Sequence, residues 1–383
     1  MCVRVLVIGR GYPEVKTGMV GIFELEQAKA VYNFGNKPID VHYMFCDNRS
    51  IFRLKQIKKI NKMEDDVYVF GRNLPIGGLP NSIFDKVKSN ISVSILKKYI
   101  QSYGVPDIIH LHFPIITLTD HFFDYIKTTK AKIVVTEHYS RVQNKELTPN
   151  QVNLLRELAC HTDKFLCVNN ELPKSIREIT GVERRFEVVP NVVTSKFVNR
   201  TVPPLDGYYR FISIGRLVKG KKFDVLIKSF YEAFKDNKNV KLLIVGDGEE
   251  YSSIKSIIEK YKLSDRVTMT GFLSRERTAE ILTKTDSYVS TSAFETFGVP
   301  IVEAMTCGKP VLIPDSSPLK SYITERHGLI FNQNDLVSKL RDMYNNRNKF
   351  ENDKIRDFAI TNFSESAVGT KLYNIYEDLL EKE

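Results

Sequence analysis

The chain has 383 residues, of which 42% are hydrophobic and 27% are charged, with 56 Lys and Arg against 46 Asp and Glu. This length suits two ordinary domains, and no apolar run approaches the length that crosses a bilayer. Residues 1–200 hold most of the net positive charge, with 29 Lys and Arg against 20 Asp and Glu. They contain no aromatic-interleaved basic motif that would predict a nucleic-acid binder.

Apolar runs and amphipathic stretches alternate through the first half of the chain, and this alternation predicts a parallel sheet with helices on both faces. The first run, Val3–Ile8, is too short for the core of a signal peptide, so we expect it to be a buried strand. The predicted strands are Val3–Ile8, Val41–Phe45, Val67–Phe70, Ile108–His112, Ile133–Glu137, Phe165–Val168 and Glu187–Val189. The predicted helices are Ile22–Phe34, Ile83–Tyr103 and Val152–Cys160.

The segment Ile51–Met63 carries five cations and no acid. Its apolar residues recur at helical spacing, so we expect a helix. Such a helix either lies on an anionic membrane or packs on the protein with a solvated lysine face. The cations are Arg53, Lys55, Lys58, Lys59 and Lys62.

The alternation stops near residue 200 and then restarts. Residues 200–207 are polar and rich in turn formers, which predicts an interdomain linker. We therefore expect an N-terminal domain over residues 1–200, a C-terminal domain over residues 201–363 and a tail helix over residues 364–383. The predicted strands after the linker are Phe211–Ile214, Leu242–Val245, Val267–Met269, Tyr288–Ser290, Val311–Ile313 and Leu329–Phe331.

The five cysteines show no spacing that is typical of a metal site. A reducing, cytoplasmic setting explains them most simply. Cys160 and Cys167 are predicted to be core thiols. The full set is Cys2, Cys46, Cys160, Cys167 and Cys307.

Two glutamates, Glu295 and Glu303, lie between two of the predicted strands. We expect Val299–Cys307 to be helical, with Gly308 ending the helix, so Glu295 precedes this helix and Glu303 lies on it. Ligands bind at the carboxyl ends of parallel strands, where helix N-termini favour anions. A carboxylate there can bind sugar hydroxyls, and the N–H groups around Phe297 can meet phosphates. The alternative is a helix with one capping acid and one solvated acid.

Three further segments follow predicted strands of the second half. The first is a glycine turn with an Arg and a Lys, which suits a diphosphate without a metal, or else is a basic surface turn. The second is a Gly-x-Gly that allows close approach of a nucleotide, or else is only a tight turn. The backbone of the third could border a nucleotide base, or else the segment only packs within the protein. The candidate residues are Gly215, Arg216, Lys221, Gly246, Gly248, Phe272 and Leu273.

In this order and spacing, the four segments between Arg210 and Phe331 closely resemble the retaining, nucleotide-sugar-dependent glycosyltransferases of family four. A weaker resemblance spans nearly the whole chain. It implies the GT-B fold, an α/β architecture of two doubly wound Rossmann-like domains that face a central cleft. It also implies that the N-terminal domain binds the acceptor, that the C-terminal domain binds the donor, and that the last helix returns to the first domain.

Three segments of the first half share the resemblance. Gly18–Ala28 resembles the family's glycine loop and first helix. Thr136–Tyr139 resembles the segment that carries the histidine of the N-terminal domain, and Val189–Val193 resembles the stretch before the linker.

The resemblance implies a role for each matching side chain. Arg216 and Lys221 would hold the donor diphosphate. Glu295 would contact the transferred sugar and Glu303 the ribose hydroxyls. His138 would face the reacting sugar.

Backbone amides would complete the implied donor site. Those of Gly298 and Val299 would add phosphate contacts, and those of Gly18 and Gly21 would close the site from the first domain. No Asp-x-Asp occurs in the chain, so neither a metal nor a cofactor besides the donor substrate is implied.

Some residues depart from the family pattern. Ser317–Ser321 replaces a usual Gly-Gly-x-Pro-Glu, the loop before Gly328 is shorter, and Lys222 replaces a frequent glycine. These changes lie near the expected sugar pocket, so the identity of the transferred sugar stays open.

The sequence predicts transfer of a sugar from a nucleoside diphosphate sugar to a glycan or lipid-linked acceptor, with retention of the anomeric configuration. Polysaccharide or lipopolysaccharide assembly is the expected setting, in the cytoplasm or peripherally at the membrane. The alternatives are a nucleotide-sugar epimerase, a phosphorylase and a non-catalytic scaffold.

Overall fold

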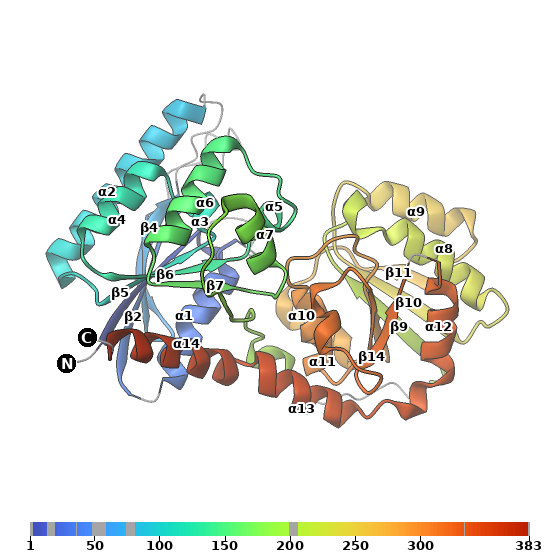
Figure 1. Cartoon of the computed structure of the whole chain (residues 1–383). Coiled ribbons are helices and arrows are strands. Elements are labelled where there is room, and N and C mark those ends of the chain that lie inside the picture. The colour runs from blue at the N-terminus through green and yellow to red at the C-terminus, as the bar shows by residue number, and fades with distance from the viewer. Residues whose placement is uncertain are drawn as a thin grey trace. The chain divides into compact units, whose positions relative to one another are not determined.

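The computed structural model describes residues 3–13, 20–35, 37–47, 59–73, 81–198, 206–332 and 334–381. The chain divides into two compact units: unit 1 comprises residues 1–192 and 365–383, and unit 2 comprises residues 193–364. Each unit has its own sheet with helices packed around it, so the predicted α/β fold of two Rossmann-like domains is confirmed (Figure 1). Residues 200–205 of the predicted linker, 200–207, lie outside the described residues.

The described part of unit 1 contains an eight-stranded sheet in the order β3-β4-β2-β1-β5-β6-β7-β8. All neighbouring strands are parallel except β3 and β4. β5 is buried at every position, as expected of a strand covered on both faces. The strands are β1 (Val3–Gly9), β2 (Ile39–Asp47), β3 (Lys59–Glu64), β4 (Val67–Asn73), β5 (Ile108–His112), β6 (Lys132–Glu137), β7 (Lys164–Cys167) and β8 (Glu187–Val188).

β3 shows that the helix predicted over Ile51–Met63 is wrong at its carboxyl end. Residues 51–58 lie outside the described residues, and Lys59–Glu64 is an edge strand antiparallel to β4. The two strands are joined by Asp65 and Asp66, whose φ angles of 47° and 63° fit a two-residue hairpin turn. In a paired strand, successive side chains alternate between the two faces of the sheet with a period of two. This strand pairing prevails over the helical spacing of the apolar residues.

The helices of unit 1 come from both ends of the chain. They are α1 (Ile22–Phe34), α2 (Asn81–Tyr103), α3 (Pro114–Thr117), α4 (Asp120–Thr128), α5 (Ser140–Gln143), α6 (Pro149–His161), α7 (Leu172–Thr180) and α14 (Glu365–Leu380).

The tail helix α14 packs on α1, side by side with it in Figure 1. A Cβ atom at Gly369 would lie 2.2 Å from the backbone oxygen of Ala30, so only glycine permits this close approach of the two helices. Leu372 and Tyr376 of α14 are buried in the same core as Val5 of β1. The tail therefore completes the core of unit 1.

The described part of unit 2 contains a six-stranded, wholly parallel sheet in the order β11-β10-β9-β12-β13-β14. The six strands predicted after the linker are confirmed to within two residues at each end. They are β9 (Tyr209–Ile214), β10 (Val240–Val245), β11 (Val267–Met269), β12 (Ser287–Val289), β13 (Val311–Pro314) and β14 (Gly328–Phe331).

The helices of unit 2 follow these strands along the chain. The α-helices are α8 (Phe223–Phe234), α9 (Tyr251–Lys260), α10 (Arg275–Thr283), α11 (Val299–Thr306), α12 (Leu336–Asn345) and α13 (Asn352–Phe363). The short 3-10 helices are η2 (Ser195–Phe197), η3 (Lys219–Lys221), η4 (Pro318–Tyr322) and η5 (Arg347–Lys349).

Two smaller expectations have different outcomes. Cys167 is a buried residue of β7, as predicted, but Cys160 is exposed, so its prediction as a core thiol is wrong. The buried face of α6 runs through Leu154, Leu158 and Ala159, and Cys160 lies off that face. None of the described helices is long and apolar enough to span a membrane.

Candidate functional site

The candidate residues of unit 2 gather where the strand order of its sheet reverses. From β9 the chain continues on one side to β10 and, later, on the other side to β12. Gly215 follows β9 directly, and Glu295 lies in the loop after β12. Ligands of open parallel sheets bind at such a switch point, outside the carboxyl ends of the strands.

The glycine turns after β9, β10 and β11 are packed backbone against backbone. The amide of Gly215 donates to Val245 at 3.0 Å, and that of Gly246 donates to Gly271 at 2.9 Å. A Cβ atom at Gly246 would lie 1.9 Å from the oxygen of Gly215, and one at Gly248 would lie 2.4 Å from that of Leu217. Glycine is therefore required at positions 246 and 248 by the packing of these turns.

The candidate cations lie in the turn after β9. Lys221 ends η3 and forms an ion pair with Glu295, and both side chains are partly exposed, by 26% and 19%. The amide of Ala293 donates to the oxygen of Gly220 at 2.9 Å, which fixes the β12 loop against this turn. Arg216 is exposed and has no ion pair or hydrogen bond from its side chain to the described residues. Its guanidinium is available to an anion.

The loop after β12 ends at the N-terminus of α11. Gly298 is the N-cap, with a φ of 90° in the left-handed region. The ring of Phe297 is buried against that of Phe363, with 5.9 Å between the ring centroids, and Val299 is also buried. Pro300 has no N–H, so the amides of Gly298 and Val299 are the donors that this helix start can offer a ligand.

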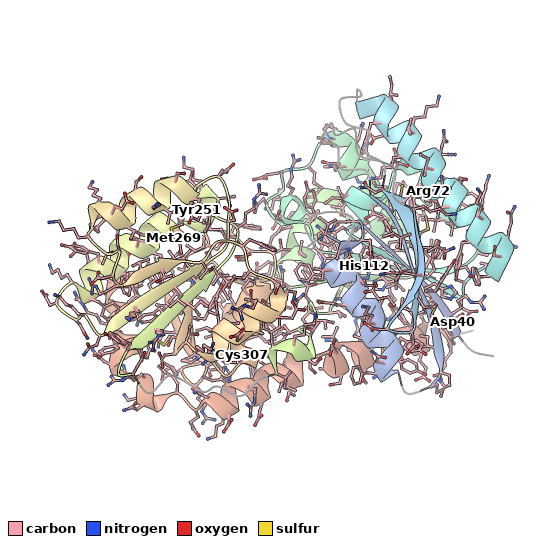
Figure 2. All side chains as sticks on the ribbon, turned by 180° about the vertical axis from the view of Figure 1, so that it is seen from behind. Asp40, Arg72, His112, Tyr251, Met269 and Cys307 are labelled. Carbon is pink, nitrogen blue, oxygen red and sulfur yellow. The ribbon has the colours of Figure 1, made fainter. Side chains whose placement is uncertain are left out.

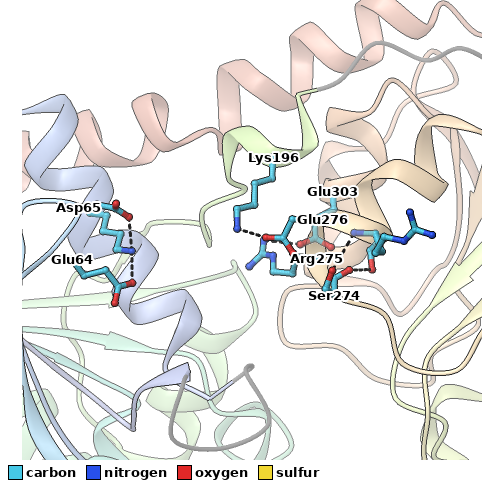
Figure 3. A network of polar contacts seen from close by, with 10 residues as sticks. Glu64, Asp65, Lys196, Ser274, Arg275, Glu276 and Glu303 are labelled. Atoms are coloured by element: carbon cyan, nitrogen blue, oxygen red, sulfur yellow. Dashed lines mark hydrogen bonds and ion pairs between the residues drawn. The ribbon is translucent and has the colours of Figure 1, made fainter. Parts of the chain in front are cut away.

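Glu303 on α11 is buried and paired with Arg275, the first residue of α10, at 2.8 Å (Figure 3). Burial raises the pKa of Glu303, and the positive charge of Arg275 opposes this effect. We did not predict Arg275 from the sequence. The available signal was its position after Ser274, whose hydroxyl accepts a hydrogen bond from the amide of Arg277 and caps α10.

Two candidates follow β11. Phe272 is 63% exposed, which is unusual for a large apolar side chain next to a packed glycine turn. Leu273 is half-buried. An exposed aromatic ring at this edge of the sheet can stack on a planar ligand.

In unit 1, the candidates Gly21 and His138 also lie at the carboxyl edge of the sheet. Gly21 caps α1 with a φ of 83°, and a Cβ atom there would lie 2.0 Å from the oxygen of Gly11. His138 directly follows β6 and is buried. Gly18 lies outside the described residues.

Burial lowers the pKa of His138 well below its ordinary value, and the charge of Arg10 lowers it further. The neighbouring Glu137 is also fully buried, which raises the pKa of its carboxyl to about 7. Hydrogen bonds from the amides of His138 at 2.8 Å and Tyr139 at 2.7 Å act against that rise. The neutral imidazole of His138 therefore lies next to the carboxyl of Glu137, whose pKa is raised to about 7.

Among the described residues, no group of three or more His, Cys, Asp or Glu side chains could hold a metal ion.

Comparison with known proteins identifies two matching family models. Residues 196–357 match "Glycosyl transferases group 1", and residues 62–197 match "Glycosyltransferase Family 4". N-acetyl-alpha-D-glucosaminyl L-malate synthase of Bacillus anthracis is 26% identical over 215 residues, which cover 54% of this chain and 56% of the relative. The chain spans about half the length of the first curated relatives it matches.

Solved structures share the fold over the whole chain. Sucrose-phosphate synthase from Thermosynechococcus elongatus superposes with a TM-score of 0.77 at 16% identity, covering 100% of both chains. HepE of Anabaena in complex with UDP and glucose gives a TM-score of 0.71 at 14% identity, covering 98% of this chain and 100% of that one. At this level of identity the likeness concerns the fold.

Proposed function

Because the chain belongs to the glycosyltransferases through its group 1 and family 4 domains, we propose that it transfers a sugar from a nucleoside diphosphate sugar to an acceptor hydroxyl with retention of the anomeric configuration. One observation carries the proposal. The turn with Arg216 and Lys221, the packed glycines and the loop with Glu295 converge at the switch point of the unit 2 sheet. Cations, close backbone and a carboxylate are what a sugar diphosphate needs.

In the proposed binding mode, Arg216 and Lys221 neutralise the diphosphate together with the amides of Gly298 and Val299. Glu295 accepts hydrogen bonds from hydroxyls of the transferred sugar. Phe272 and Leu273 border the base, and Glu303, which is paired with Arg275, binds the ribose hydroxyls.

In the proposed reaction, the bond between the anomeric carbon and the leaving phosphate oxygen breaks while the acceptor oxygen attacks from the same face. The departing diphosphate accepts the proton of the acceptor hydroxyl. The enzyme contributes positioning and stabilises the charge that develops on the leaving group. His138 contacts a substrate sugar. No metal is part of this scheme, since Arg216 and Lys221 supply the positive charge.

The test incubates the purified chain with a panel of labelled uridine and guanosine diphosphate sugars, with and without lipid-linked glycan acceptors. The expected result is a glycoside product whose anomeric proton coupling matches that of the donor. An inverted product would overturn retention. Donor consumption without any acceptor-linked product would favour an epimerase or hydrolase.

We also propose that the acceptor is a hydroxyl of a glycan or of a lipid-linked molecule used in cell-surface polysaccharide assembly. In this proposal the chain binds the acceptor at the cytoplasmic face of a membrane. The excess of nine cations over acids in residues 1–200 supports attraction to anionic lipid. Replacing Lys55, Lys58, Lys59 and Lys62 with Gln should abolish co-sedimentation with phosphatidylglycerol vesicles, whereas neutral vesicles should bind neither protein. If the unaltered chain ignores anionic vesicles at low salt, a soluble acceptor is indicated.

A further inference from the structure

His138 is held by a second buried histidine, His112, which ends β5 and is labelled in Figure 2. Nδ1 of His112 lies 2.9 Å from Nε2 of His138. A hydrogen bond between two neutral imidazoles requires a proton on one of these nitrogens and none on the other. Because each neutral ring carries a single proton, the bond fixes the tautomers of both rings together.

Both rings are neutral at ordinary pH. Burial lowers the pKa of His112 well below its ordinary value, and the neighbouring His138 and Arg10 lower it further. The other charged or titratable groups nearby are the buried Glu137, the buried Glu24, which pairs with Arg10 at 2.7 Å, and His110, whose ring lies 4.1 Å from that of His112. Because both rings are buried, the hydrogen bond between them is shielded from water.

The plane of the His138 ring is fixed by Phe113. The two rings stack at 4.4 Å with an angle of 13° between them. The guanidinium of Arg10 lies 3.4 Å from the centroid of the same Phe113 ring. Since two groups this close cannot share one face of the ring, Phe113 lies between Arg10 and His138.

The backbone of Phe113 is strained in a way that serves this stack. Its φ is 48°, in the left-handed region that a bulky aromatic residue rarely adopts. The strain is sustained by a hydrogen bond from the amide of Phe113 to Thr136 at 3.2 Å and one from the Thr117 hydroxyl to the oxygen of His112 at 2.7 Å. Such strain is typical of a residue that places a functional group.

We propose that His112 is a positioning residue for His138: it fixes the tautomer of the His138 imidazole, while Phe113, covered by Arg10, fixes the ring plane. The inference rests on the proposed function, because the sugar contact of His138 is what the arrangement serves. With Nε2 engaged by His112, the ring nitrogen of His138 that is left for a sugar hydroxyl is Nδ1, which is itself buried. A fixed tautomer makes this nitrogen either a donor or an acceptor, never a mixture. His112 itself acts through His138.

The primary test is nuclear magnetic resonance of the full chain labelled with ¹⁵N-histidine. In the unaltered protein, long-range correlations should show His138 neutral and in one tautomer from pH 5.5 to 8. A coupling across the hydrogen bond should join Nδ1 of His112 to Nε2 of His138. Absence of that coupling together with mixed tautomers in the unaltered protein overturns the proposal, and this measurement needs no variant to fold.

Variants then separate positioning from packing. His112→Phe keeps a ring but removes the hydrogen bond, so His138 should populate both tautomers. Donor turnover should fall by roughly 10- to 100-fold with little change in KM, as expected for a misplaced group. His112→Asn keeps a polar atom at the Nδ1 position and should restore one tautomer and most of the turnover. His42→Phe, which removes a buried histidine paired with Tyr99 and Asp40, is the matched control and should change neither readout.

The outcomes distinguish this inference from the proposed function. If His112→Phe leaves both the tautomer of His138 and the turnover unchanged, the positioning role is overturned. If the tautomer changes but turnover does not, His112 still sets the state of His138 and the sugar contact of His138 is overturned instead. If no donor is turned over by the unaltered chain, the spectra alone decide the inference.

Discussion

Lys221 and Glu295 are 74 positions apart in the chain and form an ion pair between the turn after β9 and the loop after β12. The pair bridges the point where the strand order of the unit 2 sheet reverses. A diphosphate bound there would compete with Glu295 for the ammonium of Lys221, and the carboxylate would gain the freedom to meet a hydroxyl. The pair therefore brings together the two groups that we assign to the diphosphate and to the transferred sugar of the donor.

Lys221→Ala should lower turnover by roughly 100-fold, the effect typical of removing a group that stabilises developing charge. The melting temperature should change little, because partly exposed ion pairs contribute only about 0–1 kcal/mol. Arg216→Ala should behave alike. Lys219→Ala, which removes an exposed cation from the same turn, is the control for net charge. Near-normal turnover in both variants would remove the diphosphate assignment.

Glu295→Gln should reduce transfer while leaving the affinity for the free nucleoside diphosphate unchanged, since the proposed partner of Glu295 is the sugar. Glu303→Ala should weaken binding of the nucleoside diphosphate by about 1–3 kcal/mol, the cost of losing a charged hydrogen-bond partner. Calorimetric titration measures both affinities. Equal losses in the two variants would contradict this division of roles.

Arg275→Met should lower the free energy of unfolding by about 3 kcal/mol, because it leaves the buried carboxylate of Glu303 without its counter-charge. The double variant Arg275→Met with Glu303→Leu should regain most of the loss, since both charges are then gone. Urea unfolding of the unaltered protein, Arg275→Met, Glu303→Leu and the double variant measures the coupling. If the double variant loses as much as the two single variants together, the pair is not a stabilising unit.

Lys222→Gly should raise the free energy of unfolding by about 0.5–1 kcal/mol. Lys222 precedes α8 with a φ of 52°, a left-handed conformation that disfavours side chains and suits glycine. Lys219→Gly, at a position without a left-handed φ, should be destabilising. Thermal unfolding of both variants decides. A less stable Lys222→Gly protein would indicate that the side chain contributes more than the strain costs.

The contribution of Glu137 to stability should be lost as the pH rises from about 4.5 to about 7, opposite in sign to that of the buried histidines His112 and His138, whose pKa values are lowered. The pKa of Glu137 is raised by burial to about 7, so in this range the unfolded state has lost a proton that the folded state keeps. Between pH 5 and pH 7.5, urea unfolding should give a change in the free energy of unfolding that is more favourable for Glu137→Gln than for the unaltered protein, by at least about 1 kcal/mol, since one pKa unit corresponds to about 1.4 kcal/mol. Glu146→Gln, at an exposed site, should follow the unaltered protein.

The sequence predicted the parallel strands well because each is a short apolar run between turn formers, and this local signal survives folding. It placed Glu295 before α11 and Glu303 on it for the same reason. It missed β3, whose pairing with β4 depends on the turn at Asp65 and Asp66 rather than on the apolar spacing of its own residues.

The residues that contact the site residues in the folded chain could not be predicted from the sequence. Arg275 meets Glu303 across 28 positions, and Phe113 meets His138 across 25, so only the folded sheet brings them together. The left-handed backbone of Phe113 also contradicts local preference, since no propensity places an aromatic residue there. Departures from local conformational preference are expected where a residue contributes to a functional site rather than to the stability of its own segment.

The return of the tail helix to unit 1 has a consequence for biosynthesis. Unit 2 is one uninterrupted stretch of chain, whereas unit 1 needs α14, the last described helix, to bury residues such as Tyr376. On the ribosome, the first half of the polypeptide therefore emerges with part of its core uncovered and stays so until α14 has been synthesised. The later-made unit can fold first, and a nascent chain stopped before Glu365 exposes an apolar surface on which chaperones can act.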